Sequence, residues 1–424
     1  MASIIQRHIT KLVLEDLDDI EVVFINGPRQ AGKSTFVETF TGHYKNVTYI
    51  TYDDLSYRAA EINSPGSTFS NIAEGLVILD EIQLVPNSFL ALKKRVDEIR
   101  RRKAKVKFLL TGSADAMLFP KLSEALVGRM YVRTMYPFSA AEILGTPHDP
   151  LKENFIKDNF LNQMFRSAPD VTREFTKLSF PSVVSKATFP KLSLEIKNKV
   201  QWCKGYISTL LDRDVKNLID IDKIEILPQL LSILAGQAGG LLNEAALAGT
   251  VKTSQPTLKR YRTLLDGVFL TYLLPPWSNN IGKRFVKSPK IYFYDTMLLC
   301  HLLGFSPGEI KDKRPDVYGF VLENFAASEL KKQLALMDDG ILYHFRTSDL
   351  KEIDFIIEKR NGDLLAIEIK AALTVMPGDF KHIRFLQSAL PKKFVSGIVL
   401  YPGERIIEFG KDLFAVPFTA LWKM

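Results

Sequence analysis

The stretch Glu21-Val-Val-Phe-Ile-Asn26 runs directly into Gly27-Pro-Arg-Gln-Ala-Gly-Lys-Ser34. The first six residues have the composition of a short buried strand. The next eight match the spacing G-x-x-x-x-G-K-[S/T] at every position, in the strand–loop–helix context that this motif requires. Glycines in such a loop let backbone N–H groups converge on phosphate oxygens, and the start of the next helix adds a positive dipole. The sequence therefore predicts a phosphate-binding P-loop in an α/β domain with a parallel sheet, and a simple glycine turn is the less favoured alternative.

Two side chains of this loop have a specific chemistry. We expect Lys33 to reach the β- and γ-phosphates of ATP during catalysis, and the Ser34 hydroxyl to bind Mg²⁺. The predicted ATP-binding residues of the loop are Gly27, Pro28, Arg29, Gln30, Ala31, Gly32, Lys33, Ser34 and Thr35.

Acidic residues follow a second buried strand. The apolar run at residues 76–79 ends in Asp80 and Glu81, the place of the acidic pair in a P-loop ATPase. We expect Asp80 to hold Mg²⁺ and Glu81 to polarise the attacking water as a general base. A solvated strand end is the alternative, and the P-loop upstream argues against it.

A third strand and a more distant arginine complete the predicted catalytic set. Residues 106–110 precede Thr111, whose hydroxyl can orient water against the γ-phosphate, although a tight turn explains this position equally well. Arg129 is a candidate γ-phosphate sensor, or a finger offered to a neighbouring subunit of a homo-oligomer. A surface arginine is the third alternative for Arg129, and the sequence leaves all three open.

These segments, together with Gly128 and residues 136–139 (Tyr-Pro-Phe-Ser), resemble the prokaryotic AAA+ superfamily ATPases of the archaeal and bacterial type. In that family an N-terminal AAA-type module is joined to a C-terminal domain of unknown function. The resemblance spans nearly the whole chain. It implies that the strand before Thr111 lies between the P-loop strand and the Asp80 strand, and that Thr111 is the sensor residue. One departure lies at residues 178–181 (Leu-Ser-Phe-Pro), where similar proteins tend to have a glycine-rich turn.

Length and local composition predict three parts. A chain of 424 residues is too long for one ordinary core, and Gly-Thr-Pro-His-Asp-Pro at residues 145–150 is the clearest linker signal. We expect an AAA-type domain over residues 1–145, a helical and winged-helix region over 151–300, and an α/β domain over 315–424. Hydrophobic residues make up 46% of the chain and charged residues 25%, which is typical of a soluble globular protein. The net charge of +8 permits contact with nucleic acid.

The sequence favours a cytoplasmic protein without a membrane span. The first residues lack the apolar core of a secretory signal. Polar residues, a proline and three glycines interrupt the most apolar stretch, residues 226–242, which we interpret as a buried helix. Cys203 and Cys300 make no disulfide framework and fit a reducing compartment.

Residues 242–265 have the pattern of a helix-turn-helix. Asn243 can cap a first helix, and Pro256 lies in the first turn of a second helix. The second helix carries Lys259, Arg260 and Arg262, and strands near residues 268–274 and 290–294 could form a wing. This is the arrangement in which a winged helix enters a DNA major groove. The same fold often packs only against protein, so contact with DNA is one of two alternatives.

The C-terminal part predicts a second site. Asp354 lies in a strand pattern, an Asn-Gly turn follows at residues 361–362, and the returning strand carries Glu368 and Lys370 on one face. The hairpin brings Asp354 close to Glu368, with Glu323 available from a preceding helix. Asp354 and Glu368 could hold a second Mg²⁺ or a Mn²⁺ that activates water, and Lys370 could stabilise the transition state.

This set of residues resembles the PD-(D/E)XK nuclease fold, with the spacing D-x(13)-E-x-K. Alternating charges on a solvent-facing hairpin are the alternative. Glu368 and Lys370 lie within an otherwise apolar run, however, where unpaired charges would be costly, so we favour a site. The fold by itself does not establish nuclease activity.

Three functional hypotheses follow from these motifs. The leading one is an ATPase whose turnover regulates binding or cleavage of DNA or RNA by a nuclease-like C-terminal domain. The second is a nucleotide-dependent switch or scaffold that binds a protein partner and has no nuclease activity. The third is a DNA-binding regulator.

Overall fold

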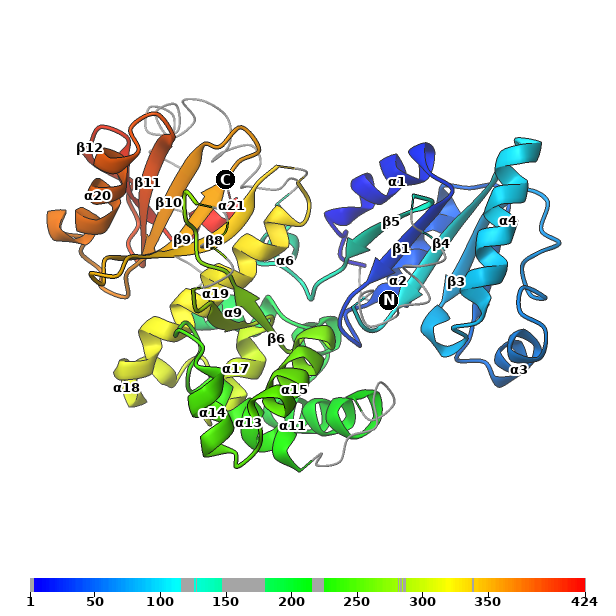
Figure 1. Ribbon diagram of the computed structural model, residues 1–424, viewed down its shortest axis with the longest axis horizontal. Helices are drawn as coiled ribbons and strands as arrows, with labels where there is room; N and C mark the ends of the chain where they lie inside the picture. Colours follow the sequence, from blue (N-terminus) through cyan, green and yellow to red (C-terminus); the bar gives the residue numbers. More distant parts are fainter. Residues whose placement is uncertain are drawn as a thin grey trace.

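The computed structural model describes residues 4–115, 126, 128–146, 180–215, 225–280, 282, 284, 287–337 and 339–423. Figure 1 shows a parallel-sheet part in blue and cyan, a mostly helical middle part in green and yellow, and a second sheet in orange and red. Most of the predicted linker and the departure at residues 178–179 lie outside the described residues.

The N-terminal sheet has five parallel strands. In spatial order they are β2 (Val47–Thr51), β3 (Gly75–Asp80), β4 (Val106–Gly112), β1 (Val22–Asn26) and β5 (Met130–Thr134). The P-loop strand β1 is separated from the Asp80 strand β3 by β4, which confirms the predicted order.

Helices cover both faces of this sheet (Figure 1). On one face lies a core that includes Val13 of α1 (Ile9–Asp19) and Phe36 of α2 (Lys33–Glu38). On the other face lies a core that includes Phe89 of α4 (Ser88–Arg102). Because both faces are buried, the strands are almost continuously apolar. The connections contain η1 (Thr39–Gly42), α3 (Leu55–Asn63) and η2 (Ile82–Leu84).

The middle part is mostly helical. Its helices are α6 (Ala140–Ile143), α9 (Phe180–Lys186), α10 (Pro190–Leu194), α11 (Lys199–Thr209), the π-helical turn η5 (Leu210–Val215), α13 (Ile226–Ala235), α14 (Glu244–Thr250), α15 (Gln255–Gly267), α17 (Thr296–Leu302) and α18 (Ile310–Lys313). Helix α13 lies within the stretch that we interpreted as a buried helix. Of the helices in the described ranges, none has the length and apolar character needed to cross a membrane.

The predicted helix-turn-helix is present as local structure. The Asn243 side chain caps α14 by accepting a hydrogen bond from the Ala246 amide, and Ser254 caps α15 through the Thr257 amide. Strands β6 (Thr271–Leu274) and β7 (Lys290–Phe293) then pair in antiparallel fashion and are slightly shorter than expected. The use of these elements as a winged helix stays a prediction.

The C-terminal sheet has six strands of mixed direction. In spatial order they are β12 (Ile407–Gly410), β13 (Leu413–Pro417), β11 (Phe394–Tyr401), β10 (Leu364–Ile369), β9 (Glu352–Glu358) and β8 (Ile341–Arg346). Strand β10 runs antiparallel to β9 and parallel to β11. The remaining helical elements are α19 (Pro315–Leu334), η6 (Pro377–Phe380), α20 (Lys381–Ala389) and α21 (Ala420–Lys423).

The middle and C-terminal parts share one hydrophobic core. It runs from Val184 and Leu231 of the middle helices, through Phe325 of α19, to Ile367 of β10 and Trp422 of α21. The opposite face of the six-stranded sheet packs on α20 through a separate core. The expected boundary near residues 300–315 therefore does not divide two independent cores, and the domain limits stay predictions.

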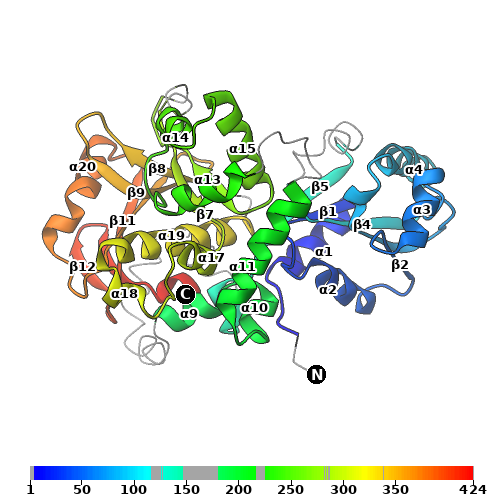
Figure 2. The ribbon, with the colours of Figure 1, turned by 90° about the horizontal axis from the view of Figure 1, so that it is seen from below.

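Several contacts join the N-terminal part to the rest of the chain, and two of them involve α11 and α19. Figure 2 shows α11 beside the strands of this sheet, and the Tyr206 hydroxyl of α11 donates a hydrogen bond of 3.2 Å to the Arg29 carbonyl. The second contact is made by Glu329 of α19, which is fully buried. Its Oε2 accepts the Ala140 amide of α6 at 2.9 Å, and its Oε1 lies 2.8 Å from Lys332 Nζ. Lys332 Nζ also donates to the Phe138 carbonyl at 3.0 Å.

We expect Glu329→Ala to lower the free energy of unfolding by about 3 kcal/mol, because Lys332 would remain buried without its partner. Urea titration monitored by circular dichroism would measure the change. Glu15→Ala is the matched control, since Glu15 forms an exposed pair with Lys11 on α1 and should leave stability unchanged. Equal urea midpoints for the wild type and Glu329→Ala would contradict the role of Glu329.

Candidate functional site: a nucleotide cavity and a carboxylate cluster

The backbone of the P-loop depends on its glycines. Gly27 and Gly32 have φ values of +149° and +90°. A Cβ atom at Gly27 would lie 2.2 Å from the carbonyl oxygen of Met135, immediately after β5. A larger residue at position 27 would therefore displace the exit of that strand.

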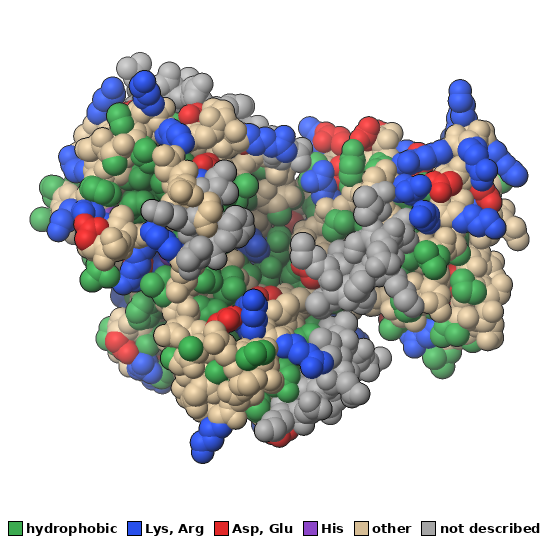
Figure 3. All heavy atoms as spheres, in the orientation of Figure 1, with side chains coloured by type: hydrophobic (Ala, Val, Ile, Leu, Met, Phe, Trp, Pro, Cys, Tyr) green, Lys and Arg blue, Asp and Glu red, His purple; other side chains and the backbone are tan. Residues whose placement is uncertain are grey.

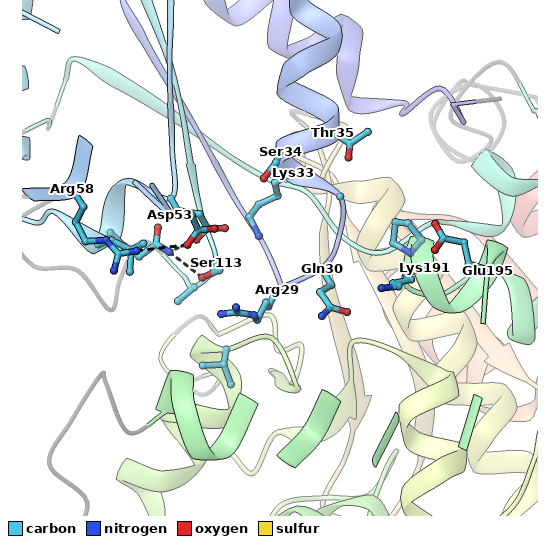
Figure 4. A pocket seen from close by; sticks show the side chains of 17 residues that line it. Arg29, Gln30, Lys33, Ser34, Thr35, Asp53, Arg58, Ser113, Lys191 and Glu195 are labelled. Atoms are coloured by element: carbon cyan, nitrogen blue, oxygen red, sulfur yellow. Dashed lines mark hydrogen bonds and ion pairs between the residues drawn. The ribbon is translucent and has the colours of Figure 1, made fainter. Parts of the chain in front are cut away.

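The P-loop opens onto a cavity of about 610 Å³ (Figure 4). On the sheet side the cavity is lined by Arg29, Gln30, Gly32, Lys33, Ser34, Thr35, Asp53, Arg58, Glu81, Gln83, Leu84, Ser113 and Ala114. Pro190, Lys191, Glu195 and Val268 of the middle part complete the lining. The cavity lies at the carboxyl ends of the parallel strands, where open α/β sheets bind ligands.

Lys33 lies inside the loop that it would use to hold phosphate. The side chain is buried, and Nζ donates to the carbonyl oxygens of Gly27 and Pro28 at 3.0 Å each. These two predicted loop residues thus act through their carbonyl groups. Phosphate oxygens entering the loop would meet a fixed ammonium group, which favours charge-assisted hydrogen bonds.

Ser34 and Asp80 lie side by side, as a Mg²⁺ site requires. Ser34 Oγ is 3.0 Å from Asp80 Oδ2, and Asp80 is buried. Tyr49 and Thr51 of β2 also donate hydroxyl hydrogen bonds to Asp80 Oδ2, at 3.0 and 3.3 Å. A carboxylate and a hydroxyl oxygen are ligands that Mg²⁺ prefers, so these two residues fit the ion.

Thr111 joins the two acidic residues of the site. Its hydroxyl donates to Asp80 Oδ1 at 2.5 Å and accepts the Glu81 amide at 2.9 Å. The Glu81 carboxylate contacts the side-chain amide of Gln83, which in turn donates to Ser113 Oγ at 3.0 Å (Figure 4). Glu81 has φ of +55°, an uncommon value for a residue other than glycine that often marks functional turns.

Arg7 connects the P-loop to α6. Its buried guanidinium donates to the Ala31 carbonyl of the loop at 3.1 Å and to the Tyr136 carbonyl at 2.5 Å. Arg7 Nε also forms an ion pair of 2.9 Å with Glu142 Oε1. Burial would raise the pKa of Glu142, but the nearby charge of Arg7 outweighs it, so that this pKa lies below its usual value.

The expectation that Arg129 senses the γ-phosphate of its own chain is wrong. Parallel pairing places Met130 beside Val22, at the start of β1, whereas the P-loop follows the end of β1. About 13 Å of strand therefore separates Arg129 from the loop. Arg129 forms an ion pair of 2.7 Å with Asp97 of α4 at this opposite edge of the sheet. Its role as a finger for a neighbouring subunit stays a prediction.

The predicted residues of the C-terminal site come together. Pairing of β9 with β10 places Asp354 next to Glu368, and Asp354 Oδ2 accepts the Ile369 amide at 2.8 Å. Lys370 Nζ lies 3.2 Å from Glu368 Oε1, and Glu368 Oε2 is buried without a hydrogen-bond partner. Burial and the charge of Asp354 raise the pKa of Glu368 to about 8, although Lys370 opposes this.

A lysine that the sequence did not single out lies in this cluster. Lys290 Nζ is 3.0 Å from Glu323 Oε1, 2.7 Å from Glu352 Oε1 and 3.4 Å from Asp354 Oδ1. Burial would lower the pKa of Lys290, but the three carboxylates outweigh it and raise this pKa above its usual value. Burial raises the pKa of Glu323 to about 7.

These contacts do not fit a divalent metal held by Asp354 and Glu368. Both oxygens of Asp354 and one oxygen of Glu368 already have donors. Across the described ranges, no three His, Cys, Asp or Glu side chains are arranged to hold a metal ion. We therefore derive no chemical step through a metal at this site.

The basic residues of α15 divide into two groups. Lys259 and Arg260 are exposed. Arg262 is buried, with Nε 2.9 Å from Glu244 Oε1 and Nη1 in contact with Asp266. The expectation that Arg262 faces DNA is therefore wrong, because this side chain ties α15 to α14.

Comparison with known proteins agrees with the geometry of the first site. Residues 19–144 match a family model described as an AAA domain. These residues form an AAA-type P-loop domain. Residues 183–309 and 318–421 match two models described as domains of unknown function, DUF8612 and DUF4143. The likeness of the C-terminal part to PD-(D/E)XK nucleases stays a prediction.

Two proteins similar to nearly the whole chain are described as uncharacterized. The chain is 29% identical over 402 residues to an uncharacterized protein of Mycobacterium tuberculosis, which covers 93% of this chain and 80% of that protein. It is 24% identical over 416 residues to an uncharacterized protein of Haemophilus influenzae, covering 92% of each. A solved Walker-type ATPase of Pyrococcus abyssi matches with 17% identity and a TM-score of 0.41, covering 71% of this chain and 96% of that one.

We expect Arg7→Met to weaken ATP binding to the AAA domain about tenfold, because the Ala31 carbonyl of the loop would lose a charge-assisted hydrogen bond. Isothermal titration calorimetry with a non-hydrolysable ATP analogue would measure the affinity. Arg133→Met is the matched control, since Arg133 pairs with Asp16 at 2.6 Å in the same domain. If both variants bound the analogue equally well, Arg7 would not position the loop.

Proposed function

We propose that the chain is a Mg²⁺-dependent ATPase in which ATP turnover at the AAA domain alters the position of the middle part. The observation that carries this proposal is the composition of the cavity. It combines the P-loop and the Asp80–Glu81 strand end with residues of α10 from the middle part. A ligand that fills this cavity would touch both parts at once.

The residues of the cavity suggest a division of roles in hydrolysis. Ser34 and Asp80 would hold Mg²⁺, which supplies positive charge to the phosphates when bound. Lys33 would bind the β- and γ-phosphates, and the Glu81 carboxylate would accept a proton from the attacking water. Thr111 fixes the Glu81 backbone, and Gln83 holds its carboxylate.

Coupling to the middle part would follow from Lys191 and Glu195. Both line the cavity, and Figure 4 shows them beside the loop, on the side away from Asp53 and Arg58. Loss of the γ-phosphate would change the charge that faces Lys191, and Coulomb interactions at this range are strong in a partly closed site. Helix α10 would therefore respond to the nucleotide state.

We expect Lys33→Ala to abolish phosphate release. We expect Glu81→Gln to bind ATP but to hydrolyse it at least about a hundredfold more slowly than the wild type. Phosphate release and ATP binding would be measured on the same preparations. Equal rates of phosphate release in the wild type and both variants would contradict the ATPase proposal. Arg129→Ala is the control for a single chain, and a loss of rate in that variant would indicate a finger acting in a neighbouring subunit.

Nucleic-acid binding is the second candidate function. The net charge of +8 favours a polyanion, and α15 presents the exposed Lys259 and Arg260 after a capped turn. Cleavage by the C-terminal part is supported by the closeness of Asp354, Glu368 and Lys370, and opposed by Lys290, which contacts the same carboxylate. The competing candidate is a switch that binds a protein partner without cleavage.

The basic groups of the AAA domain offer a matched control for this candidate. Figure 3 shows Lys and Arg side chains gathered over α4, where Arg101, Arg102, Lys103 and Lys105 are exposed. This patch lies on the far side of the sheet from the middle part. Arg101 and Arg102 of this patch together carry the same charge as Lys259 and Arg260 of α15, at a different location.

We expect Lys259→Ala/Arg260→Ala to reduce the salt dependence of duplex DNA binding, lowering the slope of log K against log salt by about two. Fluorescence anisotropy between low and physiological salt would measure it. Arg101→Ala/Arg102→Ala should leave the slope unchanged. A loss confined to the α4 variant would overturn the assignment of α15, and no binding to DNA or RNA would favour the protein-binding switch.

A further inference from the structure

We infer that the ammonium group of Lys290 is the resident cation of the C-terminal carboxylate cluster, so that the cluster binds no divalent metal while Lys290 is in place. The cluster consists of Glu323, Glu352, Asp354 and Glu368. The inference does not depend on ATP hydrolysis at the AAA domain, and it concerns what the nuclease-like site can bind.

The geometry around Lys290 is that of a coordinated cation. Lys290 is 2% exposed, and its ammonium has three donors for three carboxylate oxygens, at 3.0 Å from Glu323, 2.7 Å from Glu352 and 3.4 Å from Asp354. A Mg²⁺ ion would need oxygens of the same groups at about 2.0–2.1 Å. An ammonium and a dication cannot share these oxygens.

Other donors contact further oxygens of the cluster, and one of them shares Glu323 Oε1 with Lys290. Tyr292 OH donates to Glu323 Oε1 at 2.6 Å, and Arg346 Nη1 lies 3.0 Å from Glu352 Oε2. The Ile369 amide donates a hydrogen bond to Asp354 Oδ2, and Lys370 Nζ donates one to Glu368 Oε1. The buried Glu368 Oε2, which lacks a partner, marks where the cluster retains negative potential. The oxygens that Lys290 and the other donors leave open are too few for the near-octahedral ligand set that Mg²⁺ needs.

The charge balance of the cluster depends on Lys290. With a neutral residue at position 290, the cations of the described residues still paired with these four carboxylates would be Lys370 and Arg346. With all four carboxylates ionised, as metal ligands are, the excess is two negative charges, which matches a divalent cation that would replace the protons on Glu323 and Glu368. Removing the lysine charge should therefore create affinity for a metal that the intact cluster lacks.

The lysine and the carboxylates come from different parts of the chain. Lys290 begins β7, where it pairs with Leu274 of β6, whereas Glu323 lies on α19 and Asp354 on β9. The middle part therefore supplies the cation and the C-terminal part supplies the anions. The cluster acts as an electrostatic bond between them.

The test measures Mn²⁺ binding by the full-length chain, using the electron paramagnetic resonance signal of free Mn²⁺ as the readout. Ser34→Ala/Asp80→Asn is the background for every variant, so that the P-loop site contributes nothing. We expect no site that depends on Asp354 when Lys290 is present. Lys290→Met should bind Mn²⁺ at least about tenfold more tightly than the background chain does. Adding Asp354→Asn should remove this site.

Lys332→Met is the matched control, because it deletes another buried, ion-paired lysine and should create no Mn²⁺ site. The inference is overturned if the chain with Lys290 binds Mn²⁺ in a way that Asp354→Asn abolishes. It is also overturned if folded Lys290→Met binds no Mn²⁺. Should Lys290→Met fail to fold, the comparison of the background chain with its Asp354→Asn form still decides the first outcome, and Lys290→Arg should behave like the background.

Discussion

The buried guanidinium of Arg7 holds the P-loop against the end of the AAA domain, where the chain continues into the middle part. It holds the P-loop through the Ala31 carbonyl, the exit of the sheet through the Tyr136 carbonyl, and α6 through Glu142. The planar fork of an arginine suits three such acceptors, whereas a lysine ammonium would act as a single point of charge. A buried pair of this kind contributes little net stability but is costly to break. The position of the P-loop therefore depends on groups more than 100 residues away along the chain.

The same chain of contacts continues into the C-terminal part. The Ala140 amide at the start of α6 donates a hydrogen bond to Glu329 of α19. The same helix, α19, also carries Glu323 of the carboxylate cluster. The nucleotide cavity is lined by residues of the AAA domain and of the middle part. The carboxylate cluster combines Lys290 of the middle part with carboxylates of the C-terminal part. Because close-packed elements move as units, a shift of α10 or α6 would be carried through the shared core and not absorbed locally. This is the physical basis on which nucleotide state could reach the C-terminal sheet.

Local patterns in the sequence predict much of this architecture. The P-loop follows from spacing alone, and the order of β1, β3 and β4 agrees with the AAA resemblance. The closeness of Asp354 and Glu368 follows from the predicted hairpin, but the register does not, because Lys359 lies opposite Asp363 across a three-residue turn, whereas a two-residue Asn-Gly turn would place Asp354 opposite Ile369.

The remaining site residues are set by tertiary contacts that no local pattern encodes. Arg7 and Glu142 are 135 residues apart, and Lys290 is 33 residues from Glu323. The sequence left the roles of Arg129 and Arg262 open, because a basic residue does not reveal which strand edge or helix face it occupies; the structure removes the sensor role of Arg129 within its own chain and the exposure of Arg262. Tyr49 and Gln83 carried no signal beyond their closeness to predicted strand ends.

The contact between α6 and α21 has a consequence for biosynthesis. The Thr146 hydroxyl donates to the Trp422 carbonyl at 2.6 Å, across 276 residues of sequence. A ribosome adds about 5–20 residues per second, so roughly 15–55 s separate the emergence of these two partners. During that interval the AAA sheet can form, but Ala140 and Ala141 of α6 lack the helices that bury them. Until α21 has been synthesised, α6 therefore lacks part of the surface that buries it, and the junction between the first and last parts of the chain stays incomplete.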